Sequence, residues 1–430
     1  MTRIAACVLL ALAGTTRGAT VAAQTIAITG GKVFPVSGAP IAGATVLIRD
    51  GKVVAVGTGV GIPAGAERVD ATGKWVTPGL FDAATQLGLV EIGQVADTRE
   101  ASSRGRNSYG INAAFTVWEG LNPASVLLAP ARQEGVTSVA VAPQGGLISG
   151  QAAVIDLVDG SVAELLVRSP AGMVGEIGSA AEAGVASRGE LIVRLHELFD
   201  DTRDFMRHRT EFERNAARSY VASRIDLEAM IPVLEGRLPF FASVDKASDI
   251  EAALHLASQY GIHLVVVGGA EAWMVADRLK SANVPVLTGA MNNIPSSFAT
   301  LAQRQENAAL LRKAGVEVAL IGNAGGGDEE AFNVRNIRQE AGNAVAYGLS
   351  WDDALRAVTL APARIFGVAD RIGSLQAGTE ANVVVWSGDP FEFGTRAEQV
   401  FIRGKRMTGE TRQDLLVDRY KKLPPSYQKP

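Results

Sequence analysis

The stretch TPGLFDAATQLG, residues 77–88, separates two patterns in the sequence. On its N-terminal side, residues 45–49 and 52–56 are predicted strands that flank Asp50 and Gly51. An Asp-Gly pair is typical of a two-residue hairpin turn, because both turn positions need a positive φ. The chain therefore begins, after residue 24, with short antiparallel strands.

The same strand pattern returns near the other end of the chain, at residues 382–386 and 400–403. Two β-rich segments at opposite ends are too small to form separate cores. The sequence therefore predicts one small composite β-sandwich built from both termini, with residues 24–77 and 376–410 as its two parts.

Between these parts, over residues 78–375, apolar strands alternate with helical stretches. This alternation indicates βαβ units and a parallel sheet. The predicted fold is α/β, a TIM-like (β/α)8 barrel, whose active face lies at the carboxyl ends of the strands. The predicted barrel strands include residues 137–141, 239–243, 263–267, 284–287 and 316–321.

Three segments do not follow this alternation of strands and helices. Residues 188–218 form a charged helical excursion packed on the barrel, with Ser187 as its N-cap. Residues 91–113 form a polar loop over the active face. Residues 411–430 are a polar tail, and Ser350 is the predicted N-cap of a helix in the last part of the barrel.

The first 23 residues have the pattern of a secretory signal. Arg3 precedes an apolar run at residues 4–14, and small residues follow at 20–23. The run is too short to span a bilayer of about 30 Å. The single cysteine, Cys7, lies inside it. We therefore expect an exported, periplasmic protein without a membrane span. The net charge of −4 gives no indication of a nucleic-acid partner.

Three stretches carry a resemblance to a known family. They are residues 28–57, residues 71–88, and residues 348–391, the last being the most specific. The chain resembles the amidohydrolase superfamily, in particular secreted relatives of imidazolonepropionase and other cyclic-amide hydrolases. The resemblance implies a hydrolase of carbon–nitrogen bonds other than peptide bonds.

The resemblance also implies a metal centre that this sequence does not reproduce. In active members, a His-x-His pair, two further histidines and an aspartate hold one or two divalent cations, and a Lys or Glu can bridge them. These positions fall on Ala84 and Gln86 in the first strand, Ser243 in the fifth, Gly268 in the sixth and Asn323 in the eighth. None is a good metal ligand, so we expect no cofactor; the alternative is a divalent cation (Zn²⁺, Mn²⁺ or Mg²⁺).

The four histidines do not replace the missing ligands. His196 and His208 belong to the charged excursion, and His255 belongs to a helix. His263 begins its strand, so it lies at the opposite end of the barrel from the active face. Each is expected on the surface or packed against a helix.

Three aspartates follow or end predicted strands on the active side: Asp82, Asp245 and Asp328. They could act as general acid and base, or supply an all-oxygen site for Mg²⁺ or Ca²⁺. The alternative is structural. Asp82 would then brace a turn, Asp245 would cap the helix that begins near Ala247, and Asp328 would start another helix.

Ligand contacts are expected from uncharged polar residues. Ser149 and Gln151 lie in a predicted glycine-rich loop at the barrel mouth, residues 142–154. The substituted ligand positions Gln86, Ser243 and Asn323 complete the predicted binding set.

Two hypotheses follow. In the first, the chain is a metal-free relative that binds a small molecule or a paralogous subunit at the barrel mouth, and it can form an oligomer. In the second, it hydrolyses cyclic or linear amides through oxygen ligands such as Asp245 and Asp328. The residues favour the first, because a metal-bound hydroxide requires strong ligands to hold the cation.

Overall fold

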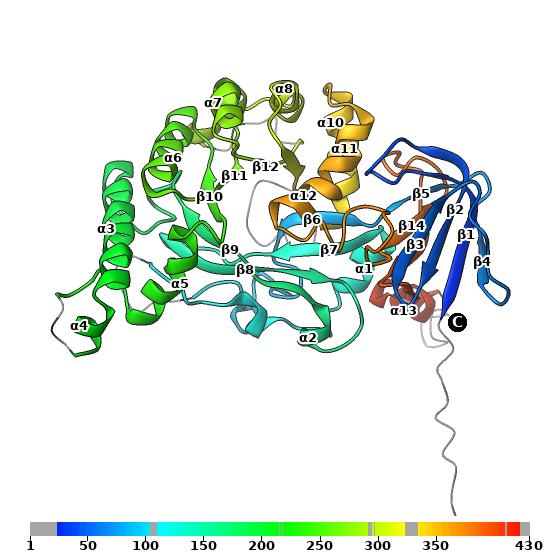
Figure 1. Ribbon diagram of the computed structural model, residues 1–430, viewed down its shortest axis with the longest axis horizontal. Helices are drawn as coiled ribbons and strands as arrows, with labels where there is room; N and C mark the ends of the chain where they lie inside the picture. Colours follow the sequence, from blue (N-terminus) through cyan, green and yellow to red (C-terminus); the bar gives the residue numbers. More distant parts are fainter. Residues whose placement is uncertain are drawn as a thin grey trace, which may run out of the picture.

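The computed structural model describes residues 24–421 apart from 104–109, 215, 217, 291–294, 296, 323–333 and 409–410. Its frame consists of two eight-stranded sheets, one curled into a nearly closed barrel and one beside it (Figure 1). Helices α3, α6, α7, α8, α10 and α11 follow the outside of the barrel (Figure 1). No helix within the described ranges is both long and apolar enough to cross a membrane.

The second sheet joins the two ends of the chain, as predicted. Its N-terminal strands are β1 (Thr25–Val33), β2 (Ile41–Arg49), β3 (Lys52–Gly57), β4 (Glu67–Asp70) and β5 (Trp75–Pro78). Its C-terminal strands are β14 (Val383–Trp386), β15 (Ala397–Ile402) and β16 (Lys405–Arg406). Strands β5 and β14 pair in antiparallel register, and this pairing links the two halves.

The predicted hairpin turn is present between β2 and β3. Asp50 has a φ of 51° and Gly51 a φ of 76°, and Arg49 pairs with Lys52 across the turn. Both turn residues therefore have the left-handed conformation that this turn requires.

The barrel sheet contains the five strands predicted by range, the first strand expected within residues 77–88, and two strands that the sequence did not predict. Its strands are β6 (Leu80–Thr85), β7 (Val136–Val141), β8 (Ile148–Asp156), β9 (Leu166–Glu176), β10 (Phe240–Val244), β11 (Leu264–Gly268), β12 (Val286–Thr288) and β13 (Val318–Leu320). They are ordered from β6 to β13 around the barrel. The first and last strands, β6 and β13, are not paired as neighbours in the sheet. One hydrogen bond bridges them: the Gly322 N–H, just after β13, donates to Asp82 Oδ2 in β6 at 3.3 Å.

One strand departs from the predicted parallel arrangement. Strand β8 runs antiparallel to both β7 and β9. Residues 142–147, which join β7 to β8, are too few for a crossover helix, whereas antiparallel strands need only a short connection. The predicted loop at 142–154 is therefore wrong over most of its length, and Ser149 and Gln151 belong to a strand.

Helices complete the layers. The first group is α1 (Leu128–Gln133), α2 (Val162–Leu165), α3 (Arg188–Arg207), α4 (Arg209–Glu213), α5 (Arg224–Leu234) and α6 (Ala247–Tyr260). The second group is α7 (Ala276–Ser281), α8 (Asn307–Lys313), α10 (Ile337–Ala346), α11 (Trp351–Ala357), α12 (Leu360–Ile365) and α13 (Arg412–Tyr420).

Two predicted helix starts are found in the structure, and a third helix begins where none was predicted. The predicted N-caps are confirmed: Ser187 accepts the Glu190 N–H at the start of α3, and Ser350 accepts the Asp353 N–H at the start of α11. The expected polar tail instead begins with a helix, α13. Thr411 caps it with Asp414 in the third position, which is a capping box that the sequence contains.

Three aromatic rings fill the inside of the barrel. Phe366, just after α12, stacks on Phe241 of β10 with ring centroids 4.6 Å apart and on Phe81 of β6 at 6.0 Å. Gly172 of β9 makes room for this stack, because a Cβ there would lie 2.2 Å from Phe241 Cε2. The barrel is therefore closed below its mouth by packed side chains.

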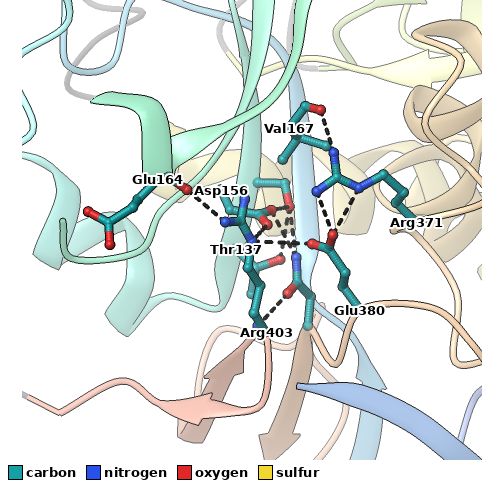
Figure 2. Close-up of polar contacts among 9 residues, drawn as sticks. Thr137, Asp156, Glu164, Val167, Arg371, Glu380 and Arg403 are labelled. Carbon is teal, nitrogen blue, oxygen red and sulfur yellow. Dashed lines mark hydrogen bonds and ion pairs between the residues drawn. The ribbon is translucent and has the colours of Figure 1, made fainter. Parts of the chain in front are cut away.

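A buried polar network joins the barrel to the second sheet (Figure 2). Asp156, at the end of β8, accepts hydrogen bonds from Ser138 Oγ at 2.7 Å and Asn382 Nδ2 at 2.9 Å. Its other oxygen accepts from Arg403 Nε at 2.7 Å, and Glu380 Oε2 lies 3.2 Å from the same nitrogen. Burial raises the pKa of Asp156 to about 6, while the positive charge of Arg403 opposes the shift.

Candidate functional site

Two adjoining cavities open at the carboxyl ends of the barrel strands. The inner cavity, of about 530 Å³, reaches down to Phe241 and Phe366, and the outer cavity, of about 660 Å³, extends past Asp245 to the exposed Phe298. The residues that line both are Ala84, Glu176, Glu182, Ser243 and Val267. This mouth is the candidate site, at the face where TIM-like barrels carry their active sites.

The structure brings the predicted ligand positions together but gives them little chemistry. Ala84 and Ser243 line both cavities, Gln86 lines the inner one and Gly268 the outer one. Gly268 has a φ of 89°, and a Cβ there would lie 2.6 Å from Asp245 Oδ1. The space that a metal-binding side chain at 268 would need is therefore occupied by the Asp245 carboxylate.

Gln86 has a buried side-chain oxygen that lacks a hydrogen-bond donor among the described residues. Its side chain is only 2% exposed, and its Oε1 has no hydrogen-bond partner among the described residues. A buried acceptor without a donor costs about 1–3 kcal/mol. The oxygen itself has almost no accessible surface, although other parts of Gln86 line the inner cavity.

Ser149 and Gln151 separate in the structure. Ser149 is buried and lines the inner cavity. Gln151 is not among the residues that line either cavity, and its Nε2 donates to the Ala113 carbonyl at 2.9 Å. Residues two apart in a regular strand share a face. Here the pairing of β8 with β9 has a register shift between Ile148 and Gly150, so the strand is not regular at this point.

Asp245 has a different role from the predicted helix cap. Its Oδ1 accepts the Ala270 N–H at 3.1 Å, so it braces the turn after β11. The first N–H of α6, that of Ala247, is instead bound by Glu271 Oε2 at 3.0 Å. Burial raises the pKa of Asp245, and the negative charge of Glu271 adds to the shift.

Asp82 lies within β6 and has a structural role, but it binds Ala84 of its own strand and Gly322 after β13 rather than a turn after β6 as predicted. Its Oδ1 accepts the Ala84 N–H at 3.2 Å, and its Oδ2 closes the barrel through Gly322. It is buried and is not among the residues that line the cavities. Asn323 and Asp328, the two other predicted site residues, lie outside the described residues.

Glu176 is the residue that sequence reasoning missed. It ends β9, pairs in register with Ser243 of β10, and lines both cavities. Its Oε1 accepts the Ser179 N–H at 2.7 Å. The available signal was an apolar run followed by a glutamate in GMVGEIG, residues 172–178, the same strand-then-acid pattern as at Asp245.

Burial raises the pKa of Glu176 to about 7. The negative charges of Asp245 and Glu182 add to the shift, and the N–H groups of Ser179 and Gly178 oppose it. The mouth therefore contains a carboxyl group that changes charge near neutral pH, which is a property of groups that exchange protons with a ligand.

The raised pKa of Glu176 predicts a pH-dependent stability. In the unfolded chain a glutamate loses its proton near pH 4.3, whereas native Glu176 keeps it up to about pH 7. The native state binds more protons between these values, so the stability that the site contributes falls as pH rises through this window. Glu176→Gln should therefore be more stabilising at pH 7.5 than at pH 4.5, by about 1.4 kcal/mol for each pH unit between the native and unfolded pKa values.

Urea unfolding of both chains at the two pH values measures this difference. Glu213→Gln, an exposed glutamate in α4, is the matched control. An equal effect of Glu176→Gln at both pH values would show that the carboxyl group is not perturbed.

The histidines take the places that the sequence predicts. His196 Nδ1 lies 2.9 Å from the Tyr260 hydroxyl, and His208 Nδ1 lies 3.0 Å from Asp204 Oδ1. His255 and His263 are exposed. None of the four is among the residues that line the two cavities.

These residues do not fit the metal centre that the resemblance implies. Ala84 has no donor, the place of a side chain at 268 is filled, and Ser243 is a weak, neutral ligand. Within the described ranges, no three His, Cys, Asp or Glu side chains are grouped to hold a metal ion. Glu176 and Asp245 are the two carboxylates at the mouth whose pKa burial raises, and they alone do not make such a group.

Comparisons with known proteins agree with the fold. Residues 234–407 match the amidohydrolase family. An amidohydrolase from Thermotoga maritima MSB8 has a crystal structure that superposes with a TM-score of 0.79, at 28% identity, over 90% of this chain and 100% of that chain. Residues 234–407 are therefore similar to the amidohydrolase family, and the chain shares its fold with a solved amidohydrolase.

Two relatives match by sequence over parts of their length. The amidohydrolase tasK of Hapsidospora irregularis is 24% identical over 380 residues, which are 80% of this chain and 37% of that protein. The imidazolonepropionase of Erwinia tasmaniensis is 35% identical over 94 residues, which are 22% of this chain and 23% of that protein. The chain thus spans 37% of the length of the first of these two relatives and 23% of the length of the second.

Proposed function

We propose that this chain is an exported member of the amidohydrolase family that binds a small molecule at the barrel mouth without a catalytic metal. One observation carries the proposal: the positions that should hold the cation have no strong donor. Ala84 and Gly268 lack one altogether, and the Asp245 carboxylate fills the space beside Gly268. Export rests on the signal-like pattern of the first 23 residues.

The mouth keeps what ligand binding requires. The two cavities are within the size range of small-molecule sites, about 300–1,000 Å³. They combine an apolar floor at Phe241 with a few polar groups, including Ser149 and Ser243. Loss of the metal therefore leaves a site that can still recognise a ligand.

A second candidate function is supported by the two buried carboxylates. Glu176 and Asp245 line the same outer cavity, and both have a raised pKa. One could take the proton of an attacking water while the other gives a proton to the leaving nitrogen of an amide. This would keep the carbon–nitrogen hydrolysis that the names of the relatives suggest.

Metal analysis of the purified chain tests the proposal. The protein is prepared without chelator, incubated with excess Zn²⁺, Mn²⁺ or Mg²⁺, freed of unbound ions and measured by mass spectrometry. We expect background metal, in parallel with a zinc hydrolase that retains its ion. About one or two ions per chain, lost on Asp245→Ala, would contradict the proposal and point to oxygen ligands.

An amide-hydrolysis screen separates the two candidates. Under the proposal, turnover is absent with and without added metal. Turnover without metal that is lost in both Glu176→Gln and Asp245→Asn, but not in Glu213→Gln, would establish the second candidate instead.

A further inference from the structure

The inner cavity has an unusual distribution of charge. Glu176 and Glu182 line it, and none of the described residues that line it is Lys, Arg or His. Two cations, Arg188 and Lys246, line the outer cavity instead. Of these, Arg188 is already held by Asp249, with Nη1 2.6 Å and 2.8 Å from the two carboxylate oxygens.

Gln86 adds a buried hydrogen-bond acceptor next to the same cavity. Gln86 Oε1 is buried and has no partner among the described residues, and Gln86 lines the cavity together with Glu176. An amide oxygen accepts hydrogen bonds and cannot donate them. Above about pH 7, where Glu176 is ionised, the carboxylate oxygens and this oxygen are all acceptors.

Several other residues that line the inner cavity are apolar. Val174, Phe241, Leu287 and Phe366 line it, and the rings of Phe241 and Phe366 are stacked on each other. An apolar wall of this kind suits a hydrocarbon body, and the face of an aromatic ring also attracts a cation. The cavity thus combines two acidic side chains with an apolar lining.

We propose that the inner cavity takes a small organic cation, a protonated amine on an apolar body. The inference rests on the proposed function, that the mouth binds a small molecule, and names the class of that molecule. An ammonium group has three donors and no acceptor, which complements the carboxylates of Glu176 and Glu182. An anion would meet two like charges.

Three probes of the same shape test the charge preference. They are 2-phenylethylamine, which is a cation at pH 8, 2-phenylethanol, which is neutral, and 3-phenylpropanoate, which is an anion. Isothermal titration of the full chain with each probe gives its dissociation constant. We expect the amine to bind at least about tenfold more tightly than the alcohol, and the carboxylate not to bind.

Variants identify the groups that provide this preference. Glu176→Gln should weaken amine binding at least about tenfold and leave the alcohol unchanged. Glu182→Gln, at an exposed position that does not endanger folding, should weaken the amine in the same direction. Glu213→Gln, which lies in α4 and lines neither cavity, should have no effect.

Equal binding of amine and alcohol, tighter binding of the carboxylate, or no binding of the amine would each overturn the inference. So would amine binding that survives both Glu176→Gln and Glu182→Gln. These results are distinct from failure of the proposed function, which shows as bound metal or as turnover. Tight binding of the carboxylate by a metal-free chain, for example, would sink the inference and leave the proposed function intact.

Discussion

Asp156→Ala is expected to lower the free energy of unfolding by about 3–5 kcal/mol, because it breaks a buried ion pair by removing one partner. Asp156 is 0% exposed and accepts from Ser138, Asn382 and Arg403. Its removal takes away an acceptor that these three donors share at the junction of the barrel and the second sheet. Urea unfolding at pH 7.5, where the carboxyl group is ionised, measures the loss.

Asp159→Ala is the matched control for this prediction. Asp159 also pairs with an arginine, Arg132, at 2.6 Å, but its side chain is 75% exposed. An exposed ion pair contributes about 0–1 kcal/mol, so the control should be nearly neutral. Similar losses in the two variants would show that burial of Asp156 does not matter to the junction.

Phe366→Ala is expected to cost about 3–5 kcal/mol, the range for removing a large aromatic side chain from a core. Its ring stacks on Phe241 and Phe81 inside the barrel, and it also lines the inner cavity. The variant should therefore unfold at a lower urea concentration, and its inner cavity should accept bulkier ligands.

Phe393→Ala is the corresponding control, because Phe393 is 88% exposed. It removes the same number of atoms from the surface and should change the free energy of unfolding little. A loss in Phe366→Ala no greater than in this control would mean that the stack below the mouth is not a packed core.

The two predictions bear on how the candidate site is held in place. The barrel mouth is carried on strands that meet the second sheet through Asp156 (Figure 2). The interior of the same barrel is filled by Phe366 and the rings stacked on it. The shape of the mouth therefore depends in part on the Asp156 junction, which lines neither cavity. A ligand site needs such support to keep a shaped cavity.

Local signals in the sequence predicted several parts of the fold correctly. The positive φ values at Asp50 and Gly51 follow from the chemistry of the turn itself. The caps at Ser187 and Ser350 need only side chains within one helical turn. The sheet from both termini followed from two short strand patterns with no other partner in the chain.

The parts that were missed depend on neighbours distant in sequence. Strand β8 contains Ser149, Gly150 and Gln151, which favour a loop locally, but pairing with β7 and β9 holds these residues in the sheet. Glu176 ends a strand that the sequence pattern did not reveal. Tertiary pairing overrides weak strand propensity in such cases.

The chain's residues already limit which side chains the mouth can offer, and therefore which metal ligands are missing at the matched positions. What stands in their place depends on how the chain packs. Packing puts the Asp245 carboxylate in the space beside Gly268 and brings Glu176 to the cavity wall. It also leaves the Gln86 oxygen buried, with no donor in the described part of the chain. Burial and proximity set the charge and the hydrogen-bonding needs of these groups, and neither is a property of a residue alone.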